Sequence, residues 1–125
     1  LQVRYSYLWA HDLTDPADAY YNQQIPYAPH HSGAAVVSAS FKRWACYYSF
    51  IYVGRRYAQP ENVRRNRLQP WYTHDLCLLR HFRLSRRLEG KLTLAVNNIF
   101  NQQYEVIANY PMPGRTLNAA LDINF

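Results

Sequence analysis

The 125-residue sequence has only two cysteines and four glycines, and it contains no long hydrophobic run. With Cys46 and Cys77 alone, and no Cys/His cluster at zinc-like spacing, neither a disulfide framework nor a structural zinc site is expected. The longest apolar runs, such as residues 76–79, are a few residues long, far below the ~18 that a membrane-spanning helix needs. These absences argue against a disulfide-stapled domain and against a helical membrane protein.

Aromatic residues are abundant instead: they make up 16% of the chain, with 12 Tyr, 5 Phe and 3 Trp. Disordered chains are poor in aromatic residues, so this composition indicates a folded protein. The chain is basic, with 14 Lys and Arg against 8 Asp and Glu and a net charge of +6. The pattern to explain is therefore a high aromatic content without apolar runs.

Alternation of apolar and polar residues is the strongest local signal. In residues 1–13 the apolar side chains fall mostly on odd positions and the polar ones on even positions, as in a strand with two different faces. The same period of two occurs in residues 33–41, 44–56, 72–84, 91–99 and 115–125. His74 and Arg80 interrupt the apolar side of their segment. The sequence predicts an all-β fold of six antiparallel strands.

The predicted connections alternate between long and short. Long, proline-containing loops are expected over residues 14–32, 57–70 and 100–114. A two-residue turn at Lys42-Arg43 and a short one at 85–90 separate them, so all the long loops should emerge at one end of the sheet. Strands of about 9–11 residues can cross a bilayer when tilted, and long loops on one side with tight turns on the other are typical of outer-membrane barrels.

Aromatic residues gather near both ends of the predicted strands. Near the short turns lie Phe41, Trp44, Phe82 and Phe125, and near the long loops lie Trp9, Tyr52, Trp71 and Tyr72. Two such belts are favoured at the two membrane interfaces. A soluble β-sandwich or small barrel also has alternating strands and stays as the alternative.

Six strands are too few to close a transmembrane barrel, because single-chain barrels begin at about eight strands. Either several chains share one barrel, or this sequence is part of a longer chain. The alternating pattern is already present at Leu1, which favours the second interpretation.

Five segments resemble, in family order, the TonB-dependent outer-membrane receptors. They are Ile25-Pro26-Tyr27-Ala28-Pro29-His30-His31 (the family's "lPyvPrh"), Gly54-Arg55-Arg56-Tyr57 ("G-x-R-Y"), Asn97-Asn98-Ile99-Phe100-Asn101-Gln102-Gln103-Tyr104 (N-N-L-F-(N/D)-x-x-Y), Tyr110-Pro111-Met112-Pro113-Gly114-Arg115 (the proline-glycine-arginine entry to the last strand) and the terminal aromatic Phe125. Together they cover about residues 25–125.

The resemblance implies a 22-stranded barrel in the bacterial outer membrane, with an N-terminal plug, that imports a scarce nutrient such as a ferric siderophore or cobalamin. Residues 1–125 would be its last six strands, with the plug domain absent from this sequence. The implied partners are membrane lipid and lipopolysaccharide, the small-molecule nutrient, TonB through the missing N-terminal region, and the assembly machinery that reads the C-terminal strand at Phe125. A soluble β-rich binding domain with a basic face remains the alternative.

Loop residues supply the candidate contacts. Arg64, Arg65 and Arg67 could bind lipopolysaccharide phosphates or an anionic ferric siderophore through charge-assisted hydrogen bonds, or could lie in a solvated loop. Tyr104 and Tyr110 could stack on a ligand or anchor the last loop.

Other chemistry is not expected. No nucleophile elbow, HExxH, P-loop or glycine-rich phosphate motif occurs, so the sequence predicts no enzyme, no cofactor and no metal. The arginines come without a nucleic-acid-binding motif, so no nucleic acid partner is predicted. His30 and His31 could contact a metal or haem, although adjacent loop histidines are more often surface residues. By parity Cys46 and Cys77 should face opposite sides of neighbouring strands and stay free thiols.

Overall fold

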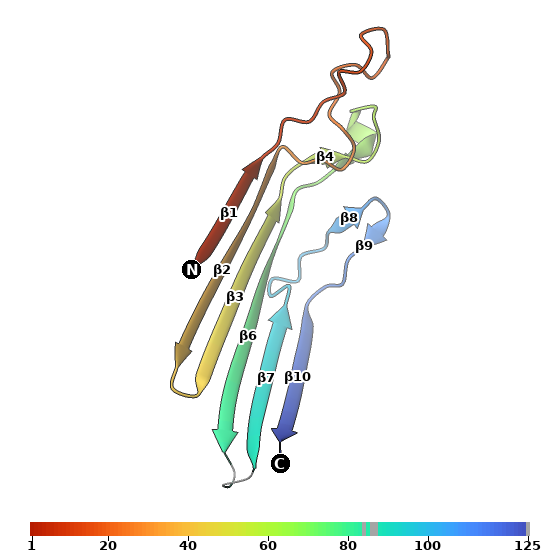
Figure 1. The fold of residues 1–125 in the computed structure, drawn as a ribbon. Helices are drawn as coiled ribbons and strands as arrows, with labels where there is room; N and C mark the ends of the chain where they lie inside the picture. Colours follow the sequence, from red (N-terminus) through yellow and green to blue (C-terminus); the bar gives the residue numbers. More distant parts are fainter. Residues whose placement is uncertain (84, 86–87, 125) are drawn as a thin grey trace.

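The computed structural model describes residues 1–83, 85 and 88–124. Its main element is a six-stranded antiparallel sheet with the strand order β1-β2-β3-β6-β7-β10 (Figure 1). The strands are β1 (Gln2–Tyr7), β2 (His31–Phe41), β3 (Trp44–Val53), β6 (Trp71–Arg83), β7 (Glu89–Asn97) and β10 (Thr116–Asn124). Each strand pairs with the one before it in the sheet, so the predicted all-β meander of six strands is confirmed.

Two strands are shorter than the alternation predicts. The first leaves the sheet after Tyr7, not at residue 13, because the chain beyond Leu8 pairs with a later part of the same loop. There Asp12 N donates to Gln23 O at 2.9 Å and Ile25 N donates to Ala10 O at 3.0 Å. Strand β3 ends at Val53, not at residue 56.

The long connections hold short elements that alternation does not reveal. Strand β4 (Arg56–Tyr57) pairs with β5 (Arg67–Leu68), and the 3-10 turn η1 (Arg64–Asn66) lies between them. Strand β8 (Glu105–Ile107) pairs with β9 (Tyr110–Pro111). All three long connections lie at one end of the sheet (Figure 1), as predicted. We call them together the loop layer: residues 8–30, 54–70 and 98–115.

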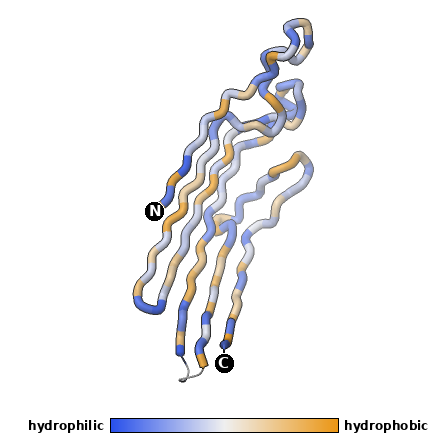
Figure 2. The backbone as a smooth tube through the Cα atoms, viewed as in Figure 1, coloured by the Kyte–Doolittle hydropathy of each residue, from blue (hydrophilic) through white to orange (hydrophobic). Residues whose placement is uncertain are grey.

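The pairing register gives the sheet two different faces. The apolar face carries Val3, Tyr5, Tyr7, Val37, Phe41, Trp44, Tyr48, Phe50, Tyr52, Tyr72, Leu76, Leu78, Leu92, Leu94, Val96, Leu117, Leu121 and Ile123. The polar face carries Arg4, Ser6, Ser38, Ser49, Thr73, Asp75, Lys91, Thr93, Asn118 and Asp122. Hydrophobic and hydrophilic residues therefore follow each other along the strands, and the turn between β2 and β3 is hydrophilic (Figure 2).

The described residues form a single-layer sheet without a hydrophobic core. Within the described part of the chain, Leu68 is the one hydrophobic residue that is buried. On the apolar face, Leu117 is 75% exposed and Phe41 is 69% exposed. No helix in the described ranges is long and apolar enough to cross a membrane.

The two polar interruptions of the apolar face are covered by aromatic rings. The Nδ1 atom of His74 hydrogen-bonds the Tyr48 hydroxyl. The His74 ring centroid lies 4.8 Å from that of Phe50 and 4.9 Å from that of Phe100. The Arg80 guanidinium lies 4.8 Å from the centre of the Trp44 ring, close enough for a cation–π interaction.

Only some of the aromatic residues lie in the two predicted belts. Phe41 and Trp44 flank the turn on the apolar face, and Tyr52 faces Tyr72 across the strands at the loop end. Trp71 is different, because its neighbour in the register is Val53 and it therefore lies on the polar face. Trp9 lies in the first loop outside any strand, and Phe125 lies outside the described residues.

The two cysteines are free and face opposite sides of the sheet, as predicted. Cys46 lies opposite Leu78, whereas Cys77 lies opposite Tyr47. Adjacent residues along a strand point to opposite faces, so Cys46 is on the apolar face and Cys77 on the polar face. This placement forbids a disulfide between them.

Candidate functional site in the loop layer

The first and second long loops are joined through one asparagine. The Asn62 side chain accepts a hydrogen bond from Gln24 N and donates one to Gln24 O at 3.0 Å. Nearby, the Tyr20 hydroxyl donates to the Glu61 carboxylate at 3.2 Å, and this bond raises the pKa of Tyr20. The Asn62 amide thus pairs with both backbone groups of one residue, much as a neighbouring strand would.

The second and third loops are joined through Arg56 on β4. Its Nη2 atom donates to the carbonyl oxygens of Glu105 at 2.6 Å and Val106 at 3.0 Å. Arg56 is only 2% exposed. Burial disfavours the charged form and lowers the pKa of this arginine.

The third loop is tied to the sheet by two asparagines in the left-handed region. Asn98 has φ of 50° and is 4% exposed. Its backbone N–H donates to the Asp75 carboxylate at 2.8 Å, and its amide bonds both backbone groups of Gln102 at 2.9 Å. Asn101, with φ of 52°, accepts a hydrogen bond from Arg115 N at 2.8 Å. Segments 97–104 and 110–115 are therefore in direct contact.

The two upstream motif segments also meet at the end of the sheet. Gly54 N donates to His31 O at 2.8 Å, and Tyr27 N donates to Tyr57 O at 2.8 Å. A Cβ atom on Gly54 would lie 2.7 Å from His31 O, so the close approach requires glycine. Segments 25–31 and 54–57 are held together by these contacts.

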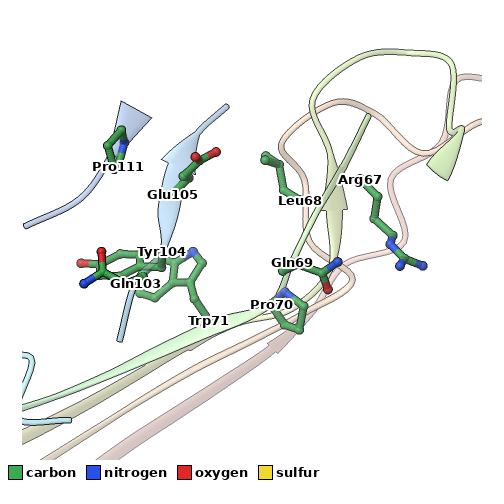
Figure 3. A pocket seen from close by; sticks show the side chains of 9 residues that line it. All are labelled: Arg67, Leu68, Gln69, Pro70, Trp71, Gln103, Tyr104, Glu105 and Pro111. Atoms are coloured by element: carbon green, nitrogen blue, oxygen red, sulfur yellow. The ribbon is translucent and has the colours of Figure 1, made fainter. Parts of the chain in front are cut away.

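A hollow of about 320 Å³ opens between the second and third loops (Figure 3). It is lined by Arg67, Leu68, Gln69, Pro70, Trp71, Gln103, Tyr104, Glu105 and Pro111. The Trp71 and Tyr104 rings pack together with their centroids 4.5 Å apart. Burial, and to a lesser extent the charge of Asp75, raises the pKa of Tyr104. The hollow combines the aromatic wall with the Glu105 carboxylate, whereas the Arg67 guanidinium points away from the two rings (Figure 3). Such a mixture of apolar and polar groups suits a polar organic ligand.

The structure brings together only two of the five candidate ligand contacts. Arg67 and Tyr104 line the hollow. Arg64 and Arg65 are exposed on η1 and do not line it, and Tyr110 on β9 is 69% exposed. Arg67 belongs to β5 and is partly buried, whereas Arg64 and Arg65 are exposed.

The adjacent histidines take different partners. His31 Nδ1 hydrogen-bonds the Tyr5 hydroxyl at 2.8 Å. The His30 ring stacks on His11 at a centroid distance of 5.5 Å, and His11 stacks on Trp9 at 4.6 Å. Among the residues with described positions, no group of three or more His, Cys, Asp or Glu side chains could hold a metal ion.

Sequence reasoning missed Arg56 as a central residue of the loop layer and Trp71 as a wall of the hollow. Arg56 is indistinguishable by composition from the other arginines, and the only signal was its place in the Gly54-Arg55-Arg56-Tyr57 motif. The strand predicted over residues 72–84 left Trp71 outside, whereas β6 begins at Trp71, and the alternation then places it on the face opposite Tyr72. In comparisons with known proteins, no family model matches this sequence and no curated protein matches it.

Proposed function

We propose that residues 1–125 are the C-terminal part of the β-barrel of a TonB-dependent outer-membrane receptor that imports a scarce nutrient such as a ferric siderophore or cobalamin. The observation that carries this proposal is the single-layer sheet, whose apolar face is largely exposed among the described residues. In a barrel this face would contact lipid, the polar face would line the lumen, and the loop layer would be extracellular.

The arrangement of side chains on the apolar face supports lipid as its cover. Phe41 and Trp44 lie at the turn end, Tyr52 and Tyr72 lie at the loop end, and aliphatic residues such as Leu78 lie between them. Aromatic rings favour the two headgroup regions and aliphatic side chains favour the hydrocarbon. The interior of a soluble protein has no such division by depth.

The open edges of the sheet support a larger barrel. Strands β1 and β10 each have one neighbour, so each presents a row of unpaired backbone groups. In hydrocarbon such a group costs several kcal/mol. Pairing these edges with further strands, up to the 22 of an outer-membrane transporter, removes this cost.

The contacts among the motif segments support the resemblance in a way that the sequence alone does not. The motif segments meet in pairs in the loop layer: 25–31 contacts 54–57, and 97–104 contacts 110–115. Arg67 and Tyr104 would contact the nutrient, and the exposed Arg64 and Arg65 would contact lipopolysaccharide phosphates. TonB would act through the N-terminal region and the assembly machinery through the C-terminal strand.

Fractionation of cells that produce the full-length protein tests this proposal. We expect the protein in the outer-membrane fraction, with gel migration that changes on heating. A water-soluble maleimide applied to isolated outer membranes should label Cys77 in the lumen and spare Cys46, while a lipid-soluble maleimide should label Cys46. Recovery in the soluble fraction, with a cooperative thermal transition without detergent, would refute the proposal and favour a soluble β-rich binding domain.

A further inference from the structure

Arg56 is a buried cation with no counter-ion among the residues that the structure describes. The two ion pairs in the described part of the chain join Arg83 to Glu89 and Lys91 to Asp122, and neither involves Arg56. Nη2 is satisfied by two carbonyl oxygens, but Nη1 is buried and bonds no described residue. A buried charge is costly unless it is both paired and hydrogen-bonded. The carbonyl oxygens supply hydrogen bonds to Arg56 but no negative charge to pair with it.

A second hollow, of about 650 Å³, lies beside Arg56. It is separate from the hollow of Figure 3 except for Trp71, which lines both. The Nε1 atom of Trp71 is also a buried donor with no partner among the described residues. Ser32 and Tyr27 add hydroxyl groups to the lining, and Val53, Pro29, Val106 and Ile107 add apolar walls. The lining therefore offers one cation and several donors but no acidic side chain.

We propose that this hollow binds the carboxylate of a small organic acid with an apolar body. Both nitrogens are buried in this structure, so the two side chains would turn toward the hollow for the carboxylate to accept hydrogen bonds from Arg56 Nη1 and Trp71 Nε1. The body would lie against Val53, Val106 and Ile107. The inference rests on the side chains of the hollow and is independent of the proposed transport function, because the same hollow serves a soluble binding protein.

The charge balance selects a carboxylate over other acceptors. A water molecule or a neutral carbonyl can accept from Nη1 but leaves the positive charge of Arg56 uncompensated. A phosphate carries close to two negative charges near neutral pH, and the hollow provides only Arg56 to balance them. A monocarboxylate brings one negative charge and two oxygens that suit a guanidinium.

Equilibrium dialysis of the full-length protein, in detergent micelles if it is a membrane protein, tests this site with radiolabelled phenylacetate as the probe. Phenylacetamide, which has the same shape without the charge, serves as the matched ligand control. We expect saturable binding of phenylacetate in the millimolar range or tighter. A charge-assisted hydrogen bond contributes about 1.5–3 kcal/mol, so the amide should bind about 10- to 100-fold more weakly.

Two substitutions locate the binding. Arg56→Gln should weaken phenylacetate binding about 10- to 100-fold, whereas Arg55→Gln, which removes the same charge from an exposed neighbour, should leave it unchanged. Trp71→Phe keeps an aromatic ring beside Tyr104 but removes the Nε1 donor, and it should weaken binding about 2- to 10-fold. This second variant decides the question if the Arg56 variant does not fold.

Three results would overturn the site. They are the absence of saturable phenylacetate binding, equal binding of acid and amide, and phenylacetate binding that is the same in wild type and the folded Arg56→Gln or Trp71→Phe variants. A soluble localisation of the protein would refute the transport proposal and leave these outcomes unaffected.

Discussion

A single methyl group at Gly54 should loosen the junction between the sheet and the loop layer. The Cβ atom of Gly54→Ala would lie 2.7 Å from His31 O, against 3.4 Å for ordinary contact, so the two atoms must separate by about 0.7 Å. The obstacle is a backbone oxygen at the start of β2, which cannot rotate away as a side chain would. The shift also lengthens the hydrogen bond from Gly54 N to the same oxygen, now 2.8 Å.

The expected cost follows from three terms. Overpacking of a tight contact costs about 1–3 kcal/mol, and the lost hydrogen bond costs about 0.5–1.5 kcal/mol. Replacing glycine restricts the unfolded chain and returns about 0.4–1 kcal/mol, since Gly54 does not need a positive φ. We expect Gly54→Ala to lower the free energy of unfolding by about 0.5–4 kcal/mol.

Gly33→Ala is the matched control, because Gly33 also faces a backbone oxygen. Its Cβ would lie 3.4 Å from Arg4 O, an ordinary contact, so this variant should be as stable as wild type or slightly more stable. The measurement is the urea midpoint followed by tryptophan fluorescence, with the full-length protein in detergent or lipid vesicles. Equal midpoints for Gly54→Ala and wild type, or an equal loss in both alanine variants, would refute the steric argument.

Three further predictions concern other contacts. Asn62→Asp replaces the amide that donates to Gln24 O with a carboxylate that repels it, so limited proteolysis should cut residues 8–30 faster than in wild type. The same charge change at the exposed Gln59 (Gln59→Glu) should not, and equal rates in the two variants would contradict the role of Asn62. Mild oxidation should give no intramolecular disulfide between Cys46 and Cys77, and an oxidation-dependent shift of the monomer on a non-reducing gel would contradict their opposite facing. Burial raises the pKa of Tyr104 above its ordinary 10.0, so the unfolded chain loses this proton first and folding stability falls as the pH rises above that value. Tyr104→Phe should flatten this fall in alkaline unfolding curves, and an unchanged slope would contradict the burial argument.

The sheet could be predicted from the sequence because a strand needs little more than alternation. A period of two assigns each side chain to a face regardless of its neighbours, and the long and short connections order the strands. The strand ends could not be predicted in the same way. Trp9 and Leu13 continue the alternation of the first strand, but hydrogen bonds within the first loop hold them outside the sheet.

The structure of the loop layer depends on individual residues, which a repeating hydrophobic pattern does not reveal. Asn98 and Asn101 adopt φ near 50°, where few residues other than glycine and asparagine are stable. Gly114 allows the Asn101 side chain to come close, since a Cβ there would lie 2.5 Å from its oxygen. Two-residue strands such as β4 are too short to show any period. A motif resemblance marks such positions, but only the folded structure shows which of them are in contact.

Arg56 shows why the charge of a sequence and the charge of a site are different quantities. Arg55, Arg64 and Arg65 contribute as much to the net charge of +6, but they are exposed, and water and salt screen their attraction for an anion. Arg56 is 2% exposed, so its field is screened far less and its donors have fixed directions. Binding selectivity for an anion should therefore follow Arg56, the one buried arginine among the described residues, and not the arginine clusters that dominate the composition. The contrast between Arg56→Gln and Arg55→Gln measures this difference at two adjacent positions of the same charge.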